Sequence, residues 1–281
     1  MKLMYLVREF ISIYLVDFIN FLYPLRKNSP RVIGEIFYEA HLFTEMNKLL
    51  KSKLDLFREK KPLPNQLGIG LSERIVEIPW TLSHLAKKGN HLDAGSSLNF
   101  RDIVLNSVFD DKKVFIVNLN PERNCYVNDS VSYVYGDLRK KIFMDEFFDS
   151  ISCVSVLEHI GMDNSGYSKE PRYKEKKKNE HLLVVDEFKR ILKKNGVCLI
   201  SVPFGKYKDH DWFQIFNKKM VADIVKTFKP SSYDIDYYKY DEKGWKQSTE
   251  KECESSGYSQ GYPGKDYCVG SYSVACIKLV N

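Results

Sequence analysis

Apolar residues change their spacing near residue 90 of this chain. Before that point they recur every three or four positions, which predicts a long helix over residues 31–61 and a helical segment over residues 72–88. Pro79 should kink or divide the second segment, because proline cannot donate the backbone hydrogen bond that a helix requires. After that point, short apolar runs alternate with stretches of helical periodicity. Such alternation indicates a largely parallel sheet with helices on both faces.

The expected elements follow from these runs. Strands are predicted over residues 91–94, 113–118, 131–135, 149–156, 197–203, 233–240 and 272–279, and helices over residues 98–109, 179–194 and 217–228. The predicted fold class is α/β: a Rossmann-like, seven-stranded, mostly parallel sheet with helices on both faces, plus an N-terminal helical extension.

A Pro-rich linker and two segments of biased composition divide the chain further. A Pro-rich linker ends at residue 65, so we expect a helical extension over residues 1–65 and a main domain over residues 66–281. Residues 164–178, rich in Lys and Tyr, and residues 249–266, rich in Gly, Ser and Tyr, are predicted to be long loops. Loops of that length in a compact domain are often lids or binding loops.

The first 25 residues are apolar and aromatic, but Glu9, Asp17 and Asn20 interrupt them. A spanning helix needs about 20 predominantly apolar residues, so this segment is not expected to cross a membrane. Two interpretations stay open. The segment either packs on its own domain or on a second copy of the chain, forming a homo-oligomer, or it makes a peripheral membrane contact through residues 1–31. The second interpretation places the protein at the inner face of the membrane.

Composition narrows the class of protein. With 43% apolar and 28% charged residues among 281, the chain can bury a large core, and global disorder and coiled coil are excluded. The net charge of +6 is modest, so no nucleic-acid partner is expected. The six cysteines include no CxxC pair, which favours a reduced, cytoplasmic protein. Cys253, Cys268 and Cys276 have spacings that match no common zinc site, so no metal is predicted.

Two segments place polar residues at the ends of predicted strands. In HLDAGSSLN, residues 91–99, a strand ends at Asp93 and Gly95 allows a tight turn into a helix. In GDL, residues 136–138, Asp137 follows a strand and can accept a hydrogen bond from an exocyclic amine. Ligands of doubly wound sheets bind at the carboxyl ends of parallel strands, so both segments are candidate contacts.

Two further segments complete the pattern. In FDSISCVSVLEHIG, residues 148–161, a buried strand runs directly into Glu158 and His159. In LKKNGVCLISVP, residues 192–203, a helix ends in basic residues and Asn-Gly, and a β-branched strand closes at Pro203. Titratable side chains at a strand's carboxyl end suit a functional site.

In this order and spacing, the four segments resemble class I S-adenosylmethionine-dependent methyltransferases. The resemblance covers roughly residues 72–281, and the third and fourth segments are its most specific parts. A narrower likeness, to bacterial enzymes that modify cell-surface glycans or small metabolites, rests on ERIVEIPW (residues 73–80) and DHDWFQIF (residues 209–216). The resemblance implies S-adenosylmethionine as cofactor and O-methylation of a sugar in a surface glycan, or of another small-molecule hydroxyl, as activity.

The resemblance also implies cofactor contacts in this sequence. They are Asp93, Ala94, Gly95, Ser96, Asn118, Asp137, Leu138, Val156 and Leu157. Asn118 is a departure, because the family usually has an acidic residue at the end of the second strand to bind the ribose hydroxyls. An amide binds a hydroxyl without charge assistance, which predicts weaker cofactor affinity or another ribose partner. The single glycine of the turn is a second departure.

A hydroxyl acceptor would require proton removal, and histidine suits that role near neutral pH. His159 is the first candidate and His210 the second, with Glu158 and Asp163 as alternative or orienting acids. Aromatic side chains suit a wall against a sugar or a planar ring. The candidates for that wall are Trp80, Tyr207 and Trp212.

A non-catalytic function is the alternative to the methyltransferase hypothesis. The Asn118 departure and the apolar N-terminus also fit a non-catalytic binding or assembly protein with a degenerate cofactor site. A nicotinamide-dependent oxidoreductase is disfavoured because the turn after the first strand has no GxGxxG.

Overall fold

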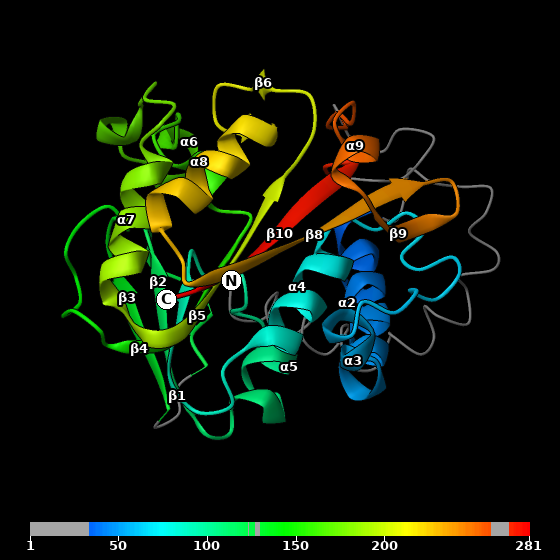
Figure 1. The fold of residues 1–281 in the computed structure, drawn as a ribbon, viewed down its shortest axis with the longest axis horizontal. Coiled ribbons are helices and arrows are strands. Elements are labelled where there is room, and N and C mark those ends of the chain that lie inside the picture. The colour runs from blue at the N-terminus through cyan, green and yellow to red at the C-terminus, as the bar shows by residue number, and fades with distance from the viewer. Residues whose placement is uncertain (1–33, 123, 127–129, 260–269) are drawn as a thin grey trace.

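The structure, a computed structural model, describes residues 34–122, 124–126, 130–259 and 270–281. The expectations for residues 1–31, and for Cys268 as a zinc ligand, lie outside these residues. The described residues form an α/β fold in which one mixed sheet runs through the middle of the molecule (Figure 1).

The sheet has eight strands in the order β3-β2-β1-β4-β5-β10-β8-β9. β1 to β5 pair in parallel, whereas β10 is antiparallel to both β5 and β8, and β9 is antiparallel to β8. The bounds are β1 Gly89–Ala94, β2 Lys112–Asn118, β3 Val131–Tyr135, β4 Phe148–Val154, β5 Leu192–Pro203, β8 Ser232–Asp241, β9 Gly244–Ser248 and β10 Ser273–Val280. The chain leaves β1 toward one edge through β2 and β3 and returns to its other side as β4. This reversal opens a crevice at the carboxyl ends of the strands.

The expectation of a seven-stranded sheet is corrected to eight strands in the described sheet, and β6 Lys208–Asp209 and β7 Gln214–Ile215 form a separate two-stranded sheet. The seven predicted strands all form, most with shifted bounds; β5 begins at Leu192, so the helix predicted to end in Asn195-Gly196 ends earlier, at Ile191. The additional strand is β9, whose sequence GWKQS has one large apolar residue and no period-two alternation. It forms because it pairs as a hairpin with β8, and because Trp245 donates a hydrogen bond to the backbone oxygen of Leu71 at 2.9 Å.

Alternate residues of the central strands supply two hydrophobic cores. On β4, Val154 belongs to one core and Cys153 to the other, and on β10 Cys276 and Ile277 divide in the same way. Successive side chains of a strand point to opposite faces, so a continuous apolar run can bury both faces of the sheet. The predicted covering of both faces is therefore confirmed for the described residues.

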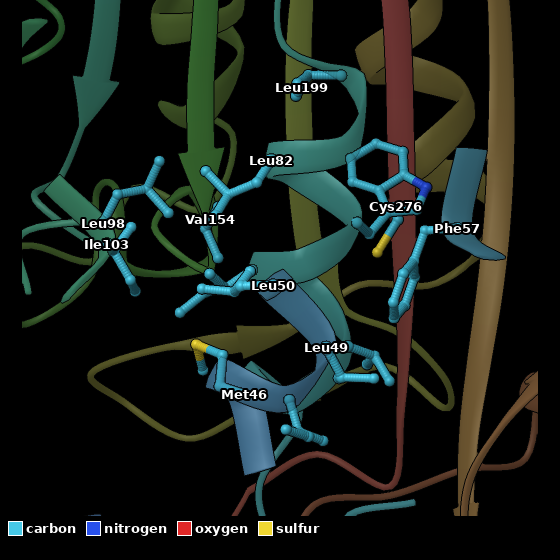
Figure 2. Packing of buried hydrophobic residues seen from close by; sticks show 14 of the residues in the cluster. Met46, Leu49, Leu50, Phe57, Leu82, Leu98, Ile103, Val154, Leu199 and Cys276 are labelled. Carbon is cyan, nitrogen blue, oxygen red and sulfur yellow. The ribbon is translucent and has the colours of Figure 1, made fainter. Parts of the chain in front are cut away.

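Helices α2 Gly34–Ser52, α3 Leu54–Arg58, α4 Arg74–His84 and α5 Arg101–Val104 cover one face. Figure 2 shows Met46, Leu49 and Phe57 of the first two helices beside Val154 and Cys276 of the sheet.

Three helix predictions have different outcomes. The single helix predicted over residues 31–61 is interrupted between α2 and α3, because Lys53 has non-helical backbone angles. The helix predicted over residues 98–109 is broken into α5 and a 3₁₀ turn, Ser107–Phe109. α4 continues through Pro79 without division.

The opposite face is covered by α7 His181–Ile191 and α8 Lys218–Phe228, which lie side by side (Figure 1). α8 begins where predicted, because Asn217 accepts a hydrogen bond from the backbone N–H of Met220 and caps the helix. Between β4 and α7 lie α6 Ser165–Ser168 and a 3₁₀ turn, Pro171–Tyr173.

None of the described helices combines the length and the apolar character that crossing a membrane requires.

Candidate active site

A cavity of about 300 Å³ lies at the carboxyl ends of β1 to β4, where the order of the strands reverses. Apolar and polar side chains from several separate segments converge on it. Its lining comprises Arg74, Gly95, Ser97, Val117, Asn118, Leu119, Gly136, Asp137, Leu138, Arg139, Ser155, Val156, His159, Ile160, Gly161, Asn164, Tyr167, Tyr173, Glu175 and Trp212. The predicted cofactor contacts Gly95, Asn118, Asp137, Leu138 and Val156 are therefore brought together, as are His159 and Trp212.

The turn after β1 requires glycine. Gly95 has a φ of +95°, and a Cβ built there would lie 2.3 Å from Cγ2 of Val156. Its backbone N–H donates to the Val117 oxygen at 2.7 Å, which ties the turn to the end of β2. The chain can therefore pass close to Val156 only without a side chain at residue 95.

Asp93 supports this turn from inside the protein and does not line the cavity. One carboxylate oxygen accepts a hydrogen bond from the backbone N–H of Leu98 at 2.9 Å, and burial raises the pKa of Asp93 to about 7. Ala94 and Leu157 lie in the hydrophobic core, and Ser96 has a buried hydroxyl. These four predicted contacts lie behind the cavity wall rather than on it.

The amide of Asn118, at the end of β2, is surrounded by hydrogen-bonding partners. Its nitrogen donates to the Glu122 carboxylate and to the Tyr167 hydroxyl, the latter at 2.8 Å. Its oxygen accepts from the backbone N–H of Leu119 at 2.8 Å and from the Tyr167 hydroxyl at 3.1 Å. A carboxylate, that of Glu122, therefore lies beside the Asn118 amide, four residues after the end of β2.

Asp137, after β3, is held by Arg139. The guanidinium donates to both carboxylate oxygens, the shortest distance being 2.7 Å, and also contacts Glu175 at 2.8 Å and Glu180 at 2.9 Å. Burial favours the neutral carboxyl, but the hydrogen bonds from Arg139 hold the pKa of Asp137 below its usual value. Asp137 is therefore an ionised acceptor on the cavity wall.

His159 follows β4 in a short 3₁₀ turn, Leu157–His159, and its ring lies 4.9 Å from the Trp212 ring. Its Nδ1 is 2.9 Å from the backbone oxygen of Trp212. Because a carbonyl oxygen only accepts, Nδ1 carries the proton and Nε2 keeps its lone pair. Burial lowers the pKa of His159 to about 4, so the imidazole is neutral at physiological pH.

Other predicted site residues lie away from this cavity. The His210 ring stacks on Phe213 at 4.4 Å, and the Asp163 carboxylate accepts from the backbone N–H and hydroxyl of Ser165. Tyr207 lines a separate open hollow beside Lys218 and Lys219. Trp80 is in the core, 1% exposed, and its indole donates to Asp236 at 2.9 Å. Of the three predicted wall residues, Trp212 alone lines the cavity, and its side chain is half exposed.

Sequence reasoning missed Arg74, the first residue of α4, which reaches the cavity. It pairs with Glu77 at 2.8 Å, and the other Glu77 oxygen accepts from the Ser155 hydroxyl at 2.6 Å. The available signal was the ERIVEIPW segment, whose acids and arginine fall one helical turn apart. The sequence of that segment did not indicate that α4 would contact the carboxyl end of β4, where Arg74 donates a hydrogen bond to the Val154 oxygen.

Glu158 is a buried acid behind the cavity, 4% exposed, and one of its oxygens has no partner among the described residues. Burial raises its pKa from 4.5 to about 8. Between these values the folded state binds more protons than the unfolded state, so the stability that the neutral acid contributes is lost as the pH rises.

We expect the variant Glu158→Gln to show a shallower loss of stability between pH 6 and pH 8. The glutamine is neutral throughout, so the slope that one proton contributes, up to about 1.4 kcal/mol per pH unit, is removed. Urea unfolding of both proteins at a series of pH values measures this difference. Parallel pH profiles for the two proteins would show that Glu158 does not titrate in this range.

Comparison with known proteins gives similar solved structures only. No family model matches the chain, and no curated protein matches it. A Burkholderia thailandensis 1,6-didemethyltoxoflavin-N1-methyltransferase, solved with its substrate and S-adenosylhomocysteine, is 13% identical, with 86% of this chain and 89% of that chain covered and a TM-score of 0.44. A SAM-dependent methyltransferase from Methanosarcina mazei is 14% identical, with 70% and 94% covered and a TM-score of 0.42.

A third similar structure is Haemonchus contortus phosphoethanolamine N-methyltransferase 2 with S-adenosylhomocysteine. It is 17% identical, covers 55% of this chain and 36% of its own, and has a TM-score of 0.40. These identities and TM-scores are low, so the architecture and the site rest on the chain's own strand order and side chains.

Proposed function

We propose that the protein is an S-adenosylmethionine-dependent methyltransferase that methylates a hydroxyl of a sugar in a glycan or of another small molecule. One observation carries the proposal. The cavity gathers Gly95, Asn118, Asp137 and Val156 from the ends of four different strands, at the point where the strand order reverses. These are residues that the resemblance to class I methyltransferases assigns to one cofactor.

The chemistry of the lining fits that cofactor. A cavity of about 300 Å³ is at the lower limit for small-molecule sites, which span about 300–1,000 Å³. Asp137 is an ionised acceptor for an exocyclic amine, and the apolar side chains of Leu138 and Val156 suit the faces of a purine. Asn118 with Glu122 offers an amide and a carboxylate to a pair of hydroxyls. The departure at Asn118 therefore leaves a usable donor and acceptor set.

When bound, S-adenosylmethionine supplies an electrophilic methyl group on its sulfonium sulfur. The chain's own residues position the acceptor and receive its proton. His159 Nε2 would take the proton of an acceptor hydroxyl, and the bound cofactor would supply the methyl group. Because burial keeps the pKa of His159 near 4, the imidazolium then releases its proton readily to solvent. The half-exposed Trp212 ring beside it offers a face for a sugar or planar ring.

A second candidate function is a non-catalytic protein of the same fold with a degenerate cofactor site. One observation favours it. The Asn118 amide is already hydrogen-bonded by Glu122, Leu119 and Tyr167 of the same chain, so its polar atoms are satisfied without a ligand.

Ligand-dependent stability separates the two functions. A ligand of the folded state at 100 times its Kd should stabilise the protein by about 2.7 kcal/mol, so we expect S-adenosylhomocysteine to raise the melting temperature by several degrees. The measurement is a thermal unfolding series with S-adenosylmethionine, S-adenosylhomocysteine and, as control, NAD. No shift at millimolar S-adenosyl ligand would favour the non-catalytic protein.

The acceptor is tested by product mass. Glycan and nucleotide-sugar acceptors, incubated with S-adenosylmethionine and the protein, should gain the mass of one methyl group. Transfer to amines alone, with no methylated hydroxyl, would leave the methyltransferase and overturn the O-methyl specificity.

A further inference from the structure

Residues 161–180, here called the β4–α7 loop, contribute Gly161, Asn164, Tyr167, Tyr173 and Glu175 to the cavity lining and contact two other loops. On one side, the Asn120 side chain donates to the backbone oxygen of Tyr167 at 2.8 Å. On the other side, the backbone N–H of Asp163 donates to the Asp211 oxygen at 3.0 Å, and Lys178 pairs with Asp209 at 2.9 Å. The loop therefore joins the segment after β2 to the segment after β5.

The two attachments differ in strength. The side near Asp163 is also attached by an ion pair between Lys176 and Asp211 at 3.2 Å and by a hydrogen bond from the Gln214 side chain to the Lys178 oxygen at 2.9 Å. The side near Tyr167 is attached through side chains, and Tyr167 itself is 57% exposed. α6, which carries Tyr167, has only four residues. The Tyr167 end is thus the one that can be released at the smaller cost in free energy.

The Tyr167 hydroxyl makes the contacts with Asn118 that a ligand hydroxyl would make. It accepts from the Asn118 nitrogen at 2.8 Å and can donate to the Asn118 oxygen at 3.1 Å. The remaining amide hydrogen is taken by Glu122, and the remaining lone pair by the Leu119 N–H. An amide has two donors and two acceptor lone pairs, so this one has no capacity left for another hydroxyl.

We propose that the β4–α7 loop is a gate to the cofactor site and that Tyr167 is its latch, holding the place of a ribose hydroxyl on Asn118 until the cofactor displaces it. The inference rests on the proposed function, because it takes the ligand at Asn118 to carry a vicinal diol. A diol can engage the Asn118 amide and the Glu122 carboxylate together, whereas the phenol engages the amide alone. The ligand that opens the gate is therefore selected by its two hydroxyls.

The test is the affinity of the full chain for S-adenosylhomocysteine, measured by titration calorimetry. Tyr167→Phe keeps the ring and removes the competing hydroxyl, so we expect the Kd to fall about 3- to 10-fold, the equivalent of one typical hydrogen bond. Tyr233→Phe is the matched control, since the Tyr233 side chain on β8 is 59% exposed, close to the 57% of Tyr167, and does not line the cavity; its Kd should stay within about twofold of the original. In an Asn118→Ala background, Tyr167→Phe should no longer change the Kd.

An unchanged or increased Kd in Tyr167→Phe would overturn the gate, an increase meaning that the hydroxyl contacts the ligand. If the original protein binds and Tyr167→Phe binds more tightly, the gate and the proposed function both stand. If the original protein binds and Tyr167→Phe binds equally well, the proposed function stands and the gate fails. If no variant binds, the cofactor site itself is absent and the inference falls with it.

Discussion

Replacing His159 with alanine should lower methyl transfer by at least about 100-fold while leaving the affinity for S-adenosylhomocysteine unchanged. The ring lines the cavity, and its Nδ1–H is committed to the Trp212 oxygen, so Nε2 is the atom left to receive a proton. Without it, the acceptor oxygen must lose its proton to water. Turnover and Kd measured on the same preparation separate this catalytic loss from a loss of binding.

The control for His159 is His210→Ala. His210 stacks on Phe213 outside the cavity lining, so its replacement should reduce turnover far less than that of His159. The pH profile gives a second readout. Since burial lowers the pKa of His159 to about 4, its protonation should not reduce activity until the pH approaches that value. Undiminished turnover in a folded His159→Ala protein would remove His159 from the mechanism.

Replacing Gly95 with alanine should destabilise the protein by at least about 2 kcal/mol and abolish measurable cofactor binding. The residue has a φ of +95°, which L side chains rarely adopt, and the new Cβ would lie 2.3 Å from Val156 Cγ2. To relieve the clash, either the turn or Val156 must move, and both form the cavity wall. Urea unfolding and calorimetric titration with S-adenosylhomocysteine measure the two effects.

Gly166→Ala is the matched control for Gly95. Gly166 has no heavy atom within 4 Å of a built Cβ and lies in the short helix α6, so an alanine there should change stability by no more than about 0.5 kcal/mol. Equal stabilities for the two alanine variants would show that the turn after β1 tolerates a side chain.

The strands could be predicted from the sequence because a strand buried on both faces needs a continuous apolar run. GVCLISVP is such a run apart from Ser201, and FDSISCV combines apolar residues with the small side chains of Ser150 and Ser152; both form central strands. β9 could not be predicted, because its formation depends on pairing with β8 and on the contact between Trp245 and Leu71. The interruption of the helix at Lys53 could not be predicted either, because apolar residues keep a helical spacing across it.

The candidate site was predictable where a residue directly follows a strand of the parallel sheet. Gly95, Asn118, Asp137, Val156 and His159 follow four such strands, and the sheet brings their ends to one edge. Within each turn, however, the sequence does not say which side chain faces outward. Asp93 and Glu158 are each adjacent or close in sequence to a lining residue, yet both are buried behind the wall.

The sequence by itself determined the class of fold, the order along the chain of the seven strands that it predicted, and the glycine turn, because these depend on local periodicity and backbone freedom. Only the tertiary structure decided which distant residues meet. Arg74 of α4, Glu122 after β2 and Tyr167 of the β4–α7 loop reach the site through contacts between segments far apart in the chain. Such contacts are set by side-chain packing and hydrogen bonding in three dimensions, which leave no periodic signal in the sequence.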